Sequence, residues 1–224
     1  IGKAALYSNT TGTKNTAVGY NALDANTTAQ RNTAVGYDAM GVNTTGDYNT
    51  AVGSYALDAN TTGDDNVAVG DASLSSNTTG LENTAVGRYA LFSNTTASYN
   101  TSLGFKAGYA ITTGTDNTLV GSYCGMTATT DIGLTGIGKG ALQNSSGGYN
   151  TAMGVSALSS ITGNHNVAIG RNTMGGSTSV NYCTAVGDYA LDATGTGDSN
   201  VAIGYNALTA NTGGNTNVAV GVNC

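Results

Sequence analysis

The chain has 224 residues, of which 7 are basic and 13 are acidic, so charged residues make up 9% and the formal net charge at pH 7 is −6. Glycine contributes 34 residues, whereas proline and tryptophan are absent. So little charge excludes a coiled coil or helical bundle, and so few basic residues offer no surface for a nucleic-acid backbone. The composition predicts a β-rich, turn-rich chain and favours internal repeats.

A five-residue pattern, Asn-Thr-Ala-Val-Gly, recurs along the whole chain. It begins at Asn15, Asn32, Asn49 and Asn83, and close variants begin at Asn66, Asn100, Asn117, Asn150, Asn166, Cys183, Asn200 and Asn217. The spacing is 17 residues, apart from two repeats of 16 between Leu134 and Asn166. Seventeen residues are too few for a strand–helix–strand unit, so every repeat must be all-β. We therefore predict one continuous parallel β-solenoid domain over residues 1–224, with about 13–14 coils stacked ~4.8 Å apart.

Each repeat is expected to contain two short extended pieces joined by glycine-containing turns. In the first piece Thr16 and Val18 share one face, while Ala17 lies on the other. We expect the Val18 column to point into the coil. There it should meet a second apolar column, which consists of Leu23, Met40, Leu57, Leu74, Leu91, Leu142, Leu158, Met174, Leu191 and Leu208. The two short repeats each lack one residue in the second turn, where a deletion leaves the strands intact.

None of the charged residues falls within a five-residue block in any repeat. A strand with one wet face should carry charges on that face, so we predict that this strand is buried on both faces. The outward column of small residues is then the candidate oligomer interface of a homotrimer with the strands around a shared axis; a monomeric solenoid is the alternative. Its members are Ala17, Ala34, Ala51, Ala68, Ala85, Ala152, Ala168, Ala185, Ala202 and Ala219.

Two patterns resemble known fibre proteins. Asn166-Val-Ala-Ile-Gly and Asn200-Val-Ala-Ile-Gly are similar to the head repeats of trimeric autotransporter adhesins, and Asn15 to Leu23 with Asn26-Thr27-Thr28 resembles repeats of phage tail fibres. The resemblance implies a left-handed β-roll, three chains wide, that serves outside the cell as the shaft or head of a tail fibre or surface adhesin. The repeat is longer than in the adhesin heads, and no heptad stalk, neck, membrane anchor or chaperone domain occurs.

We expect a fragment of a longer fibre on the cell surface or on a virion appendage, with copies of itself as partner. The alternative is a self-assembling extracellular filament subunit, stacked end to end and carrying glycans. The sequence has no stretch of 18 apolar residues, so we expect no membrane insertion.

We expect no enzymatic activity and no cofactor. His165 is the single histidine, which leaves no second one for a triad or a His-rich metal site. The turns lack the regular aspartate of calcium-binding repeats, and the glycines do not form a phosphate-binding loop. Cys124, Cys183 and Cys224 lie several coils apart, too far for a disulfide within one chain.

Two sets of residues are candidate glycan sites. Asn-Thr-Thr is an N-glycosylation sequon that recurs in one column, and the alternative is a structural ladder of stacked asparagines. The tyrosines that follow the strand are candidates for contact with host-surface glycans, and the alternative is packing on neighbouring coils. A threonine column also raises ice binding, but valines interrupt it and we expect it to face inward. The glycan candidates are Asn9, Asn26, Asn43, Asn60, Asn77 and Asn94, and Tyr20, Tyr37, Tyr55 and Tyr89.

Overall fold

The computed structural model describes residues 1–176, 179–192, 195 and 197–224, and it divides into two compact units, Ile1–Asp116 and Asn117–Cys224. Within these residues every strand has three residues and no helix occurs. The first unit contains β1 (Thr16–Val18), β2 (Thr33–Val35), β3 (Thr50–Val52), β4 (Val67–Val69), β5 (Thr84–Val86) and β6 (Thr101–Leu103). The second unit contains β7 (Thr118–Val120), β8 (Thr135–Ile137), β9 (Thr151–Met153), β10 (Val167–Ile169), β11 (Thr184–Val186), β12 (Val201–Ile203) and β13 (Val218–Val220).

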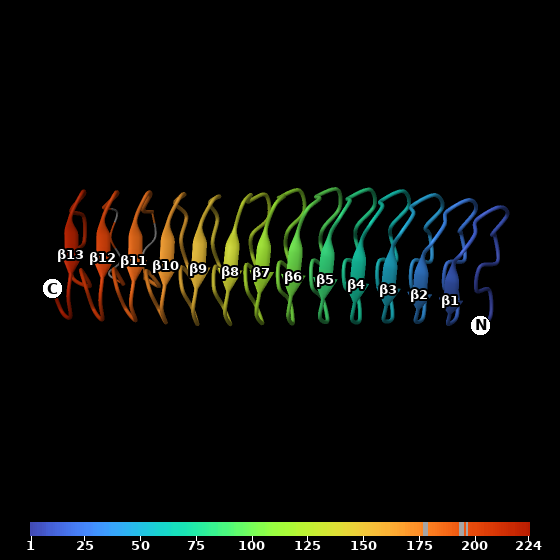
Figure 1. The fold of residues 1–224 in the computed structure, drawn as a ribbon, viewed down its shortest axis with the longest axis horizontal. Helices are drawn as coiled ribbons and strands as arrows, with labels where there is room; N and C mark the ends of the chain where they lie inside the picture. Colours follow the sequence, from blue (N-terminus) through green and yellow to red (C-terminus); the bar gives the residue numbers. More distant parts are fainter. Residues whose placement is uncertain (177–178, 193–194, 196) are drawn as a thin grey trace. The chain divides into compact units, whose positions relative to one another are not determined.

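Within each unit every strand pairs in parallel with the next strand along the chain (Figure 1). The pairing is in register, so that Thr16 lies beside Thr33 and Ala17 beside Ala34. Register is kept across a short repeat, where Thr135 pairs with Thr151, because the missing residue lies in the turn. The fold is a parallel β-solenoid with a 17-residue period, as predicted, with about 12 coils. The predicted number is higher because Ile1, counted in the valine column, lies in no strand.

The rest of each coil is a run of stacked turns, so the prediction of a second extended piece is wrong. Asn21 and Leu23 both have φ of 52°, a left-handed conformation that ends an extended segment. The turns of successive coils are nevertheless joined, since the Leu23 N–H donates to the Ala39 carbonyl at 3.1 Å and the Ala25 N–H to the Gly41 carbonyl at 3.0 Å. Backbone hydrogen bonds therefore connect the coils at the turns as well as at the strand.

The glycine after each strand is required by the close approach of successive coils. Gly53 has φ of 141°, and a β-carbon at this position would lie 2.4 Å from the Gly70 carbonyl oxygen. A side chain would therefore meet both an unfavourable backbone conformation and a steric overlap.

The coil interior holds the leucine column, as predicted, but not the valine column. Leu57 and Ala51 are both 0% exposed, whereas Val52 is 37% exposed. The interior is narrow, and the leucines already fill it, so only small strand residues fit opposite them. Leu119, which occupies an alanine position, shows this limit: the leucine position of the same coil is Gly125, where a β-carbon would lie 2.7 Å from Leu119 Cδ1.

The alanine column is thus the inner side of the strand, and its assignment as the oligomer interface is wrong. All of its members are buried except the last, which is half-buried. The side chains lie inside the coil, where no second copy can reach them. They are Ala17, Ala34, Ala51, Ala68, Ala85, Ala152, Ala168, Ala185, Ala202 and Ala219.

Candidate interaction surfaces

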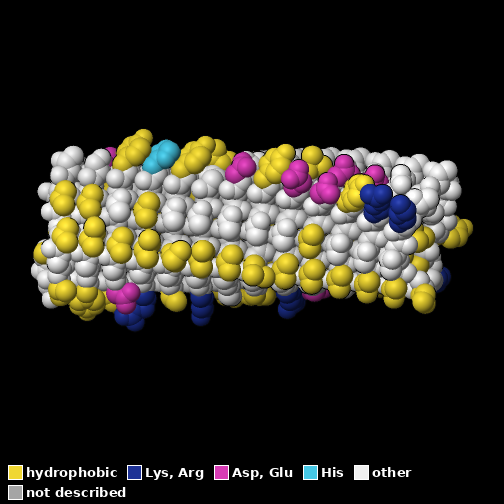
Figure 2. All heavy atoms as spheres, viewed as in Figure 1, with side chains coloured by type: hydrophobic (Ala, Val, Ile, Leu, Met, Phe, Trp, Pro, Cys, Tyr) yellow, Lys and Arg dark blue, Asp and Glu magenta, His cyan; other side chains and the backbone are white. Residues whose placement is uncertain are grey.

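The exposed side of the strands forms a flat surface, called here the outer strand face. It consists of the first and third residue of each strand. The first residue is Thr or Val, and the third is mostly Val in the first unit and Val, Ile or Met in the second. Figure 2 looks onto this face, where the third residues form a line of hydrophobic side chains. Val18 is 39% exposed and Leu103 is 45% exposed. The sequence-based expectation that the Thr16 column faces inward is wrong, because inner and outer positions alternate and Ala17 is inside.

The outer strand face carries no charged residue in any strand. On the inner side of the strand, burial explains this exclusion. On the outer side it does not, because the third residues of many strands expose more than a third of their surface. An exposed apolar surface without charge is the mark of an interaction surface rather than of an ordinary solvated face.

One edge of this face is formed by the residue two positions before each strand, called here the entry row. In the first unit these residues are Lys14, Arg31, Tyr48, Asp65, Glu82, Tyr99 and Asp116. All of them are exposed, and all have φ between 53° and 62°. The left-handed backbone repeats in every coil, so the side chains of the row leave the coil at equivalent points.

The opposite edge, where the chain leaves the strand, carries the ion pairs. Among the described residues these are Arg88 with Asp71, 3.1 Å apart, and Arg171 with Asp188, 3.5 Å apart. The Arg88 guanidinium also lies 4.6 Å from the centroid of the Tyr89 ring. Both arginines at this edge are thus paired with an aspartate of a neighbouring coil.

The Asn-Thr-Thr column forms a buried ladder, so its assignment as glycosylation sites is wrong for the folded chain. The Asn60 Nδ2 donates to the Gly63 carbonyl at 3.0 Å and to the Asn43 Oδ1 at 2.9 Å. A side chain that is fully buried and hydrogen-bonded between coils has no space for an attached glycan. Within the column Asn26, Asn43, Asn60, Asn77 and Asn94 are buried, and Asn9 is half-buried.

A second asparagine ladder, which the sequence analysis missed, precedes the strands, with Leu134 before β8 and Cys183 before β11 in place of asparagine. The Asn32 Oδ1 accepts from the Asn49 N–H at 2.8 Å, and the Asn32 Nδ2 donates to the Gly46 carbonyl at 2.8 Å. The asparagine that begins nearly every repeat was the available signal. An uncharged polar residue repeated inside a buried block must find hydrogen-bond partners.

The candidate tyrosines pack mainly on one another. Tyr20 and Tyr37 are stacked with ring centroids 5.2 Å apart, and Tyr37 meets Tyr55 edge-on at 5.3 Å. Tyr89 packs against the ring of Phe92 at 5.5 Å. Much of the ring surface is therefore in contact within the chain, as in the alternative interpretation, and glycan contact at these tyrosines stays a prediction.

In the second unit the entry row forms an aromatic stack. His165 lies between Tyr149 and Tyr182, with centroid distances of 5.0 and 5.2 Å and nearly parallel rings. Ring stacking thus holds the histidine in an exposed row. Among the described residues no group of three His, Cys, Asp or Glu side chains that could hold a metal ion includes it.

A depression of about 290 Å³ in the first unit is acidic. Gly41 lacks the side chain that Asp24 and Asp58 have in the same column, and Asp38 and Tyr55 form its walls. Partial burial raises the pKa of Asp58, although the Ser75 hydroxyl donates a hydrogen bond to this carboxylate at 2.7 Å. The described residues contain no group of three metal-ligating side chains, so this depression carries no metal assignment.

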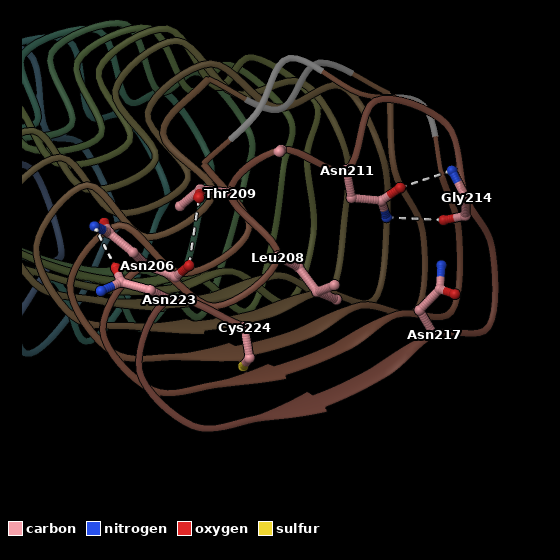
Figure 3. A pocket seen from close by; sticks show the side chains of 9 residues that line it. Asn206, Leu208, Thr209, Asn211, Gly214, Asn217, Asn223 and Cys224 are labelled. Atoms are coloured by element: carbon pink, nitrogen blue, oxygen red, sulfur yellow. Dashed lines mark hydrogen bonds between the residues drawn. The ribbon is translucent and has the colours of Figure 1, made fainter.

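The larger depression, about 530 Å³, lies at the last coil of the second unit (Figure 3). Its lining includes Leu208, Asn211 and Asn217, and the Asn211 Nδ2 donates to the Gly214 carbonyl at 2.9 Å. Equivalent positions form the buried core and the asparagine ladders of the preceding coils. The depression is thus the interior of a coil rather than a separate binding pocket.

Two of the cysteines belong to the interior. Cys124 and Cys183 are buried with free thiols, and Cys224 is exposed. Burial raises the pKa of the Cys124 thiol to about 12. These two thiols are therefore part of the packing and poor nucleophiles at neutral pH.

Comparisons with known proteins add no assignment: no family model, curated protein or solved structure matches this chain. In the described part of the chain no helix is long and apolar enough to cross a membrane. The surfaces themselves are thus the basis for a functional assignment.

Proposed function

We propose that this chain is a structural segment of an extracellular fibre, the shaft or head of a tail fibre or surface adhesin, and that it associates with copies of itself. The observation that carries this proposal is the outer strand face, which is at least partly exposed, consists of Thr and aliphatic side chains or Met, and is free of charge in every strand. The β-solenoid supports a mechanical role, because each coil is bonded to the next at both strand and turn.

Self-association explains the pattern of charge better than solvation does. Charged residues are tolerated at both edges of the strand, as at Arg31 and Asp71, but not on the face between them. A second apolar sheet face would exclude water from the Val and Thr side chains, and a charge there would lose its hydration without a partner. The homotrimer predicted from the sequence is one arrangement of this kind, with the outer strand face instead of the alanine column at the shared axis.

Analytical ultracentrifugation of the purified chain tests the proposal. The wild type should sediment as an oligomer at tens of micromolar. Val52→Glu, which puts a charge on the outer strand face, should sediment as a folded monomer, and Thr28→Glu at an exposed turn is the matched control that should leave association intact. A wild type that stays monomeric up to about 100 µM, or a V52E variant that associates normally, would contradict the proposal.

Ice binding is a second candidate, and one observation favours it. The threonines of β1, β2 and β3 lie in register on the outer strand face instead of inside the coil. Flat arrays of evenly spaced threonines can match a regular water lattice, here through rows about 4.8 Å apart. A thermal-hysteresis measurement decides: no hysteresis at millimolar protein would remove this candidate, while Thr33→Lys should abolish any hysteresis observed.

A further inference from the structure

In the first unit the charges of the entry row follow a symmetrical order. Lys14 and Arg31 are followed by Tyr48 and then by Asp65 and Glu82, each one repeat from the next. Along the upper edge of the right-hand half of Figure 2, this order appears from right to left as dark blue, then yellow, then magenta. If a second copy of this row is turned end over end about its tyrosine and laid against the first, each of the four charged residues lies opposite a residue of the other sign.

The backbone fixes the spacing of this row. The Arg31 N–H donates to the Thr13 carbonyl at 3.0 Å, and the Asp65 N–H donates to the Asp47 carbonyl at 3.1 Å. With coils about 4.8 Å apart, Lys14 and Glu82 are about 19 Å apart along the row. The row therefore presents a stable charge pattern and not a set of independent flexible sites.

These charges are not used in ion pairs within the unit. In the described part of the chain the ion pairs are Arg88–Asp71 and Arg171–Asp188, so neither Lys14, Asp65 nor Glu82 belongs to one. The Arg31 guanidinium lies over the Tyr48 ring, 5.0 Å from its centroid, and bonds the tyrosine hydroxyl. Because these charged side chains form no ion pair within the described residues, unlike Arg88 and Asp71 at the opposite edge, they are available to another molecule.

We propose that the outer strand face of the first unit binds the same face of a second copy in antiparallel orientation, with a two-fold axis at Tyr48 along the strand direction. This symmetry turns the two faces toward each other and reverses the order of the coils. Lys14 of each copy then lies opposite Glu82 of the other, and Arg31 lies opposite Asp65. The inference rests on the proposed self-association and adds its direction.

A rotation around the long axis of the solenoid cannot produce these contacts. It keeps every coil at its own level, so Lys14 of one copy stays four coils away from Glu82 of another. For the first unit the antiparallel pair therefore replaces the three-fold arrangement, since both use the same face. An antiparallel contact joins rods that point in opposite directions.

The size of the face sets the strength of the contact. The axis at Tyr48 brings β1–β5 of the two copies together, and five strands at about 4.8 Å spacing with a face about 15 Å wide give roughly 360 Å² per copy, which is smaller than a standard specific interface and typical of a weak contact. Packed sheet faces are about 10 Å apart, a gap that lysine and glutamate side chains span. We expect micromolar affinity that weakens with salt, because exposed charges are screened.

Charge reversal combined with sedimentation velocity at low salt tests the direction. Lys14→Glu with Arg31→Glu makes the row wholly acidic, and Asp65→Lys with Glu82→Lys makes it wholly basic. Each double variant should dimerise at least tenfold more weakly than the wild type, and mixing the two should restore the dimer. The variant with all four changes should pair with itself but not with the wild type. In a parallel pair the entry row of one copy lies over the opposite edge of the other, so charge reversal should not separate the double variants, the fourfold variant and the wild type, and equal association of all of them would overturn the proposal.

The outcomes separate this inference from the proposed function. A monomeric wild type means that self-association itself fails. A wild type that associates while both double variants associate equally well means that only the antiparallel direction fails. Circular dichroism of each variant verifies the fold, and because all four positions are exposed, the reversed side chains should not disturb the core.

Crosslinking gives a second measurement in a Cys224→Ser background. Tyr48→Cys should be joined to its partner copy by a short bis-maleimide reagent, because the axis places the two copies of this position about 10 Å apart, across the gap between packed faces, which is too far for a disulfide. Asp116→Cys, four coils from the axis, is the matched control: its two copies should be about 38 Å apart and remain unlinked. Equal crosslinking at both positions, or none at either, would contradict the antiparallel pair.

Discussion

The direction of the strand side chains can be tested by placing the same charge on two adjacent residues. Ala51 is fully buried between Ala34 and Ala68, which are also fully buried, whereas Val52 is 37% exposed on the outer strand face. Ala51→Asp puts a carboxylate into an interior where none of the described buried residues is basic. Val52→Asp puts the same group at the surface.

The two substitutions should differ by several kcal/mol. An uncompensated buried charge costs about 3–5 kcal/mol, and this is the expected loss of unfolding free energy for A51D at pH 7. For V52D the loss of strand propensity and of partial burial amounts to about 1 kcal/mol. With an m-value of about 2–3 kcal/mol per molar urea, the unfolding midpoint should fall by about 1–2 M for A51D and by less than about 0.5 M for V52D.

Urea titrations followed by tyrosine fluorescence at about 0.1 µM protein, well below the micromolar affinity expected for association, measure both shifts on the monomer. Ala51→Ser is the matched control, since Ser102 occupies the same column and is buried. It should be much less damaging than A51D. If V52D lowers the midpoint as much as A51D or more, the valine column faces the core and the assignment of the outer strand face is wrong.

Three further results are expected. Asn60→Ala should lower the unfolding free energy by about 1–3 kcal/mol, because it leaves the buried Asn43 Oδ1 without its donor, whereas Asn144→Ala at an exposed turn should change it by less than about 0.5 kcal/mol; thermal melts compare them. A thiol reagent at pH 8 should modify Cys224 at once and Cys124 only after unfolding, and rapid modification of two or more thiols in the native protein would contradict the burial. Partial burial raises the pKa of Asp58, so the folded chain binds this proton more tightly than the unfolded chain and loses stability as pH rises through the raised value. Asp58→Asn should therefore raise the melting temperature at pH 7 and not at pH 3, and an equal change at both pH values would refute this cause.

The period, the strand positions and the leucine column could all be predicted from the sequence, because each depends on local pattern alone. A block repeated every 17 residues with alternating side chains specifies a strand per coil, and the two deletions mark the turn. The leucines are the largest apolar residues that recur in every part of the chain, and no alternative place for them exists. Their burial follows from the hydrophobic effect without knowledge of the packing.

The inner side of the strand could not be predicted, and neither could the burial of the asparagines. Alternation divides Thr16, Ala17 and Val18 into two faces, but both faces are uncharged, and hydrophobicity alone favours valine for the core. The tertiary structure decides by volume: leucines from the turns fill the narrow coil, so alanine fits opposite them and valine does not. In the same way the sequence identifies Asn60 only as a turn residue, because its burial depends on a hydrogen bond to Asn43 of the neighbouring coil. Alternation along the sequence specifies which residues share a face, whereas the packing of one coil on the next specifies which of the two faces is left for a partner.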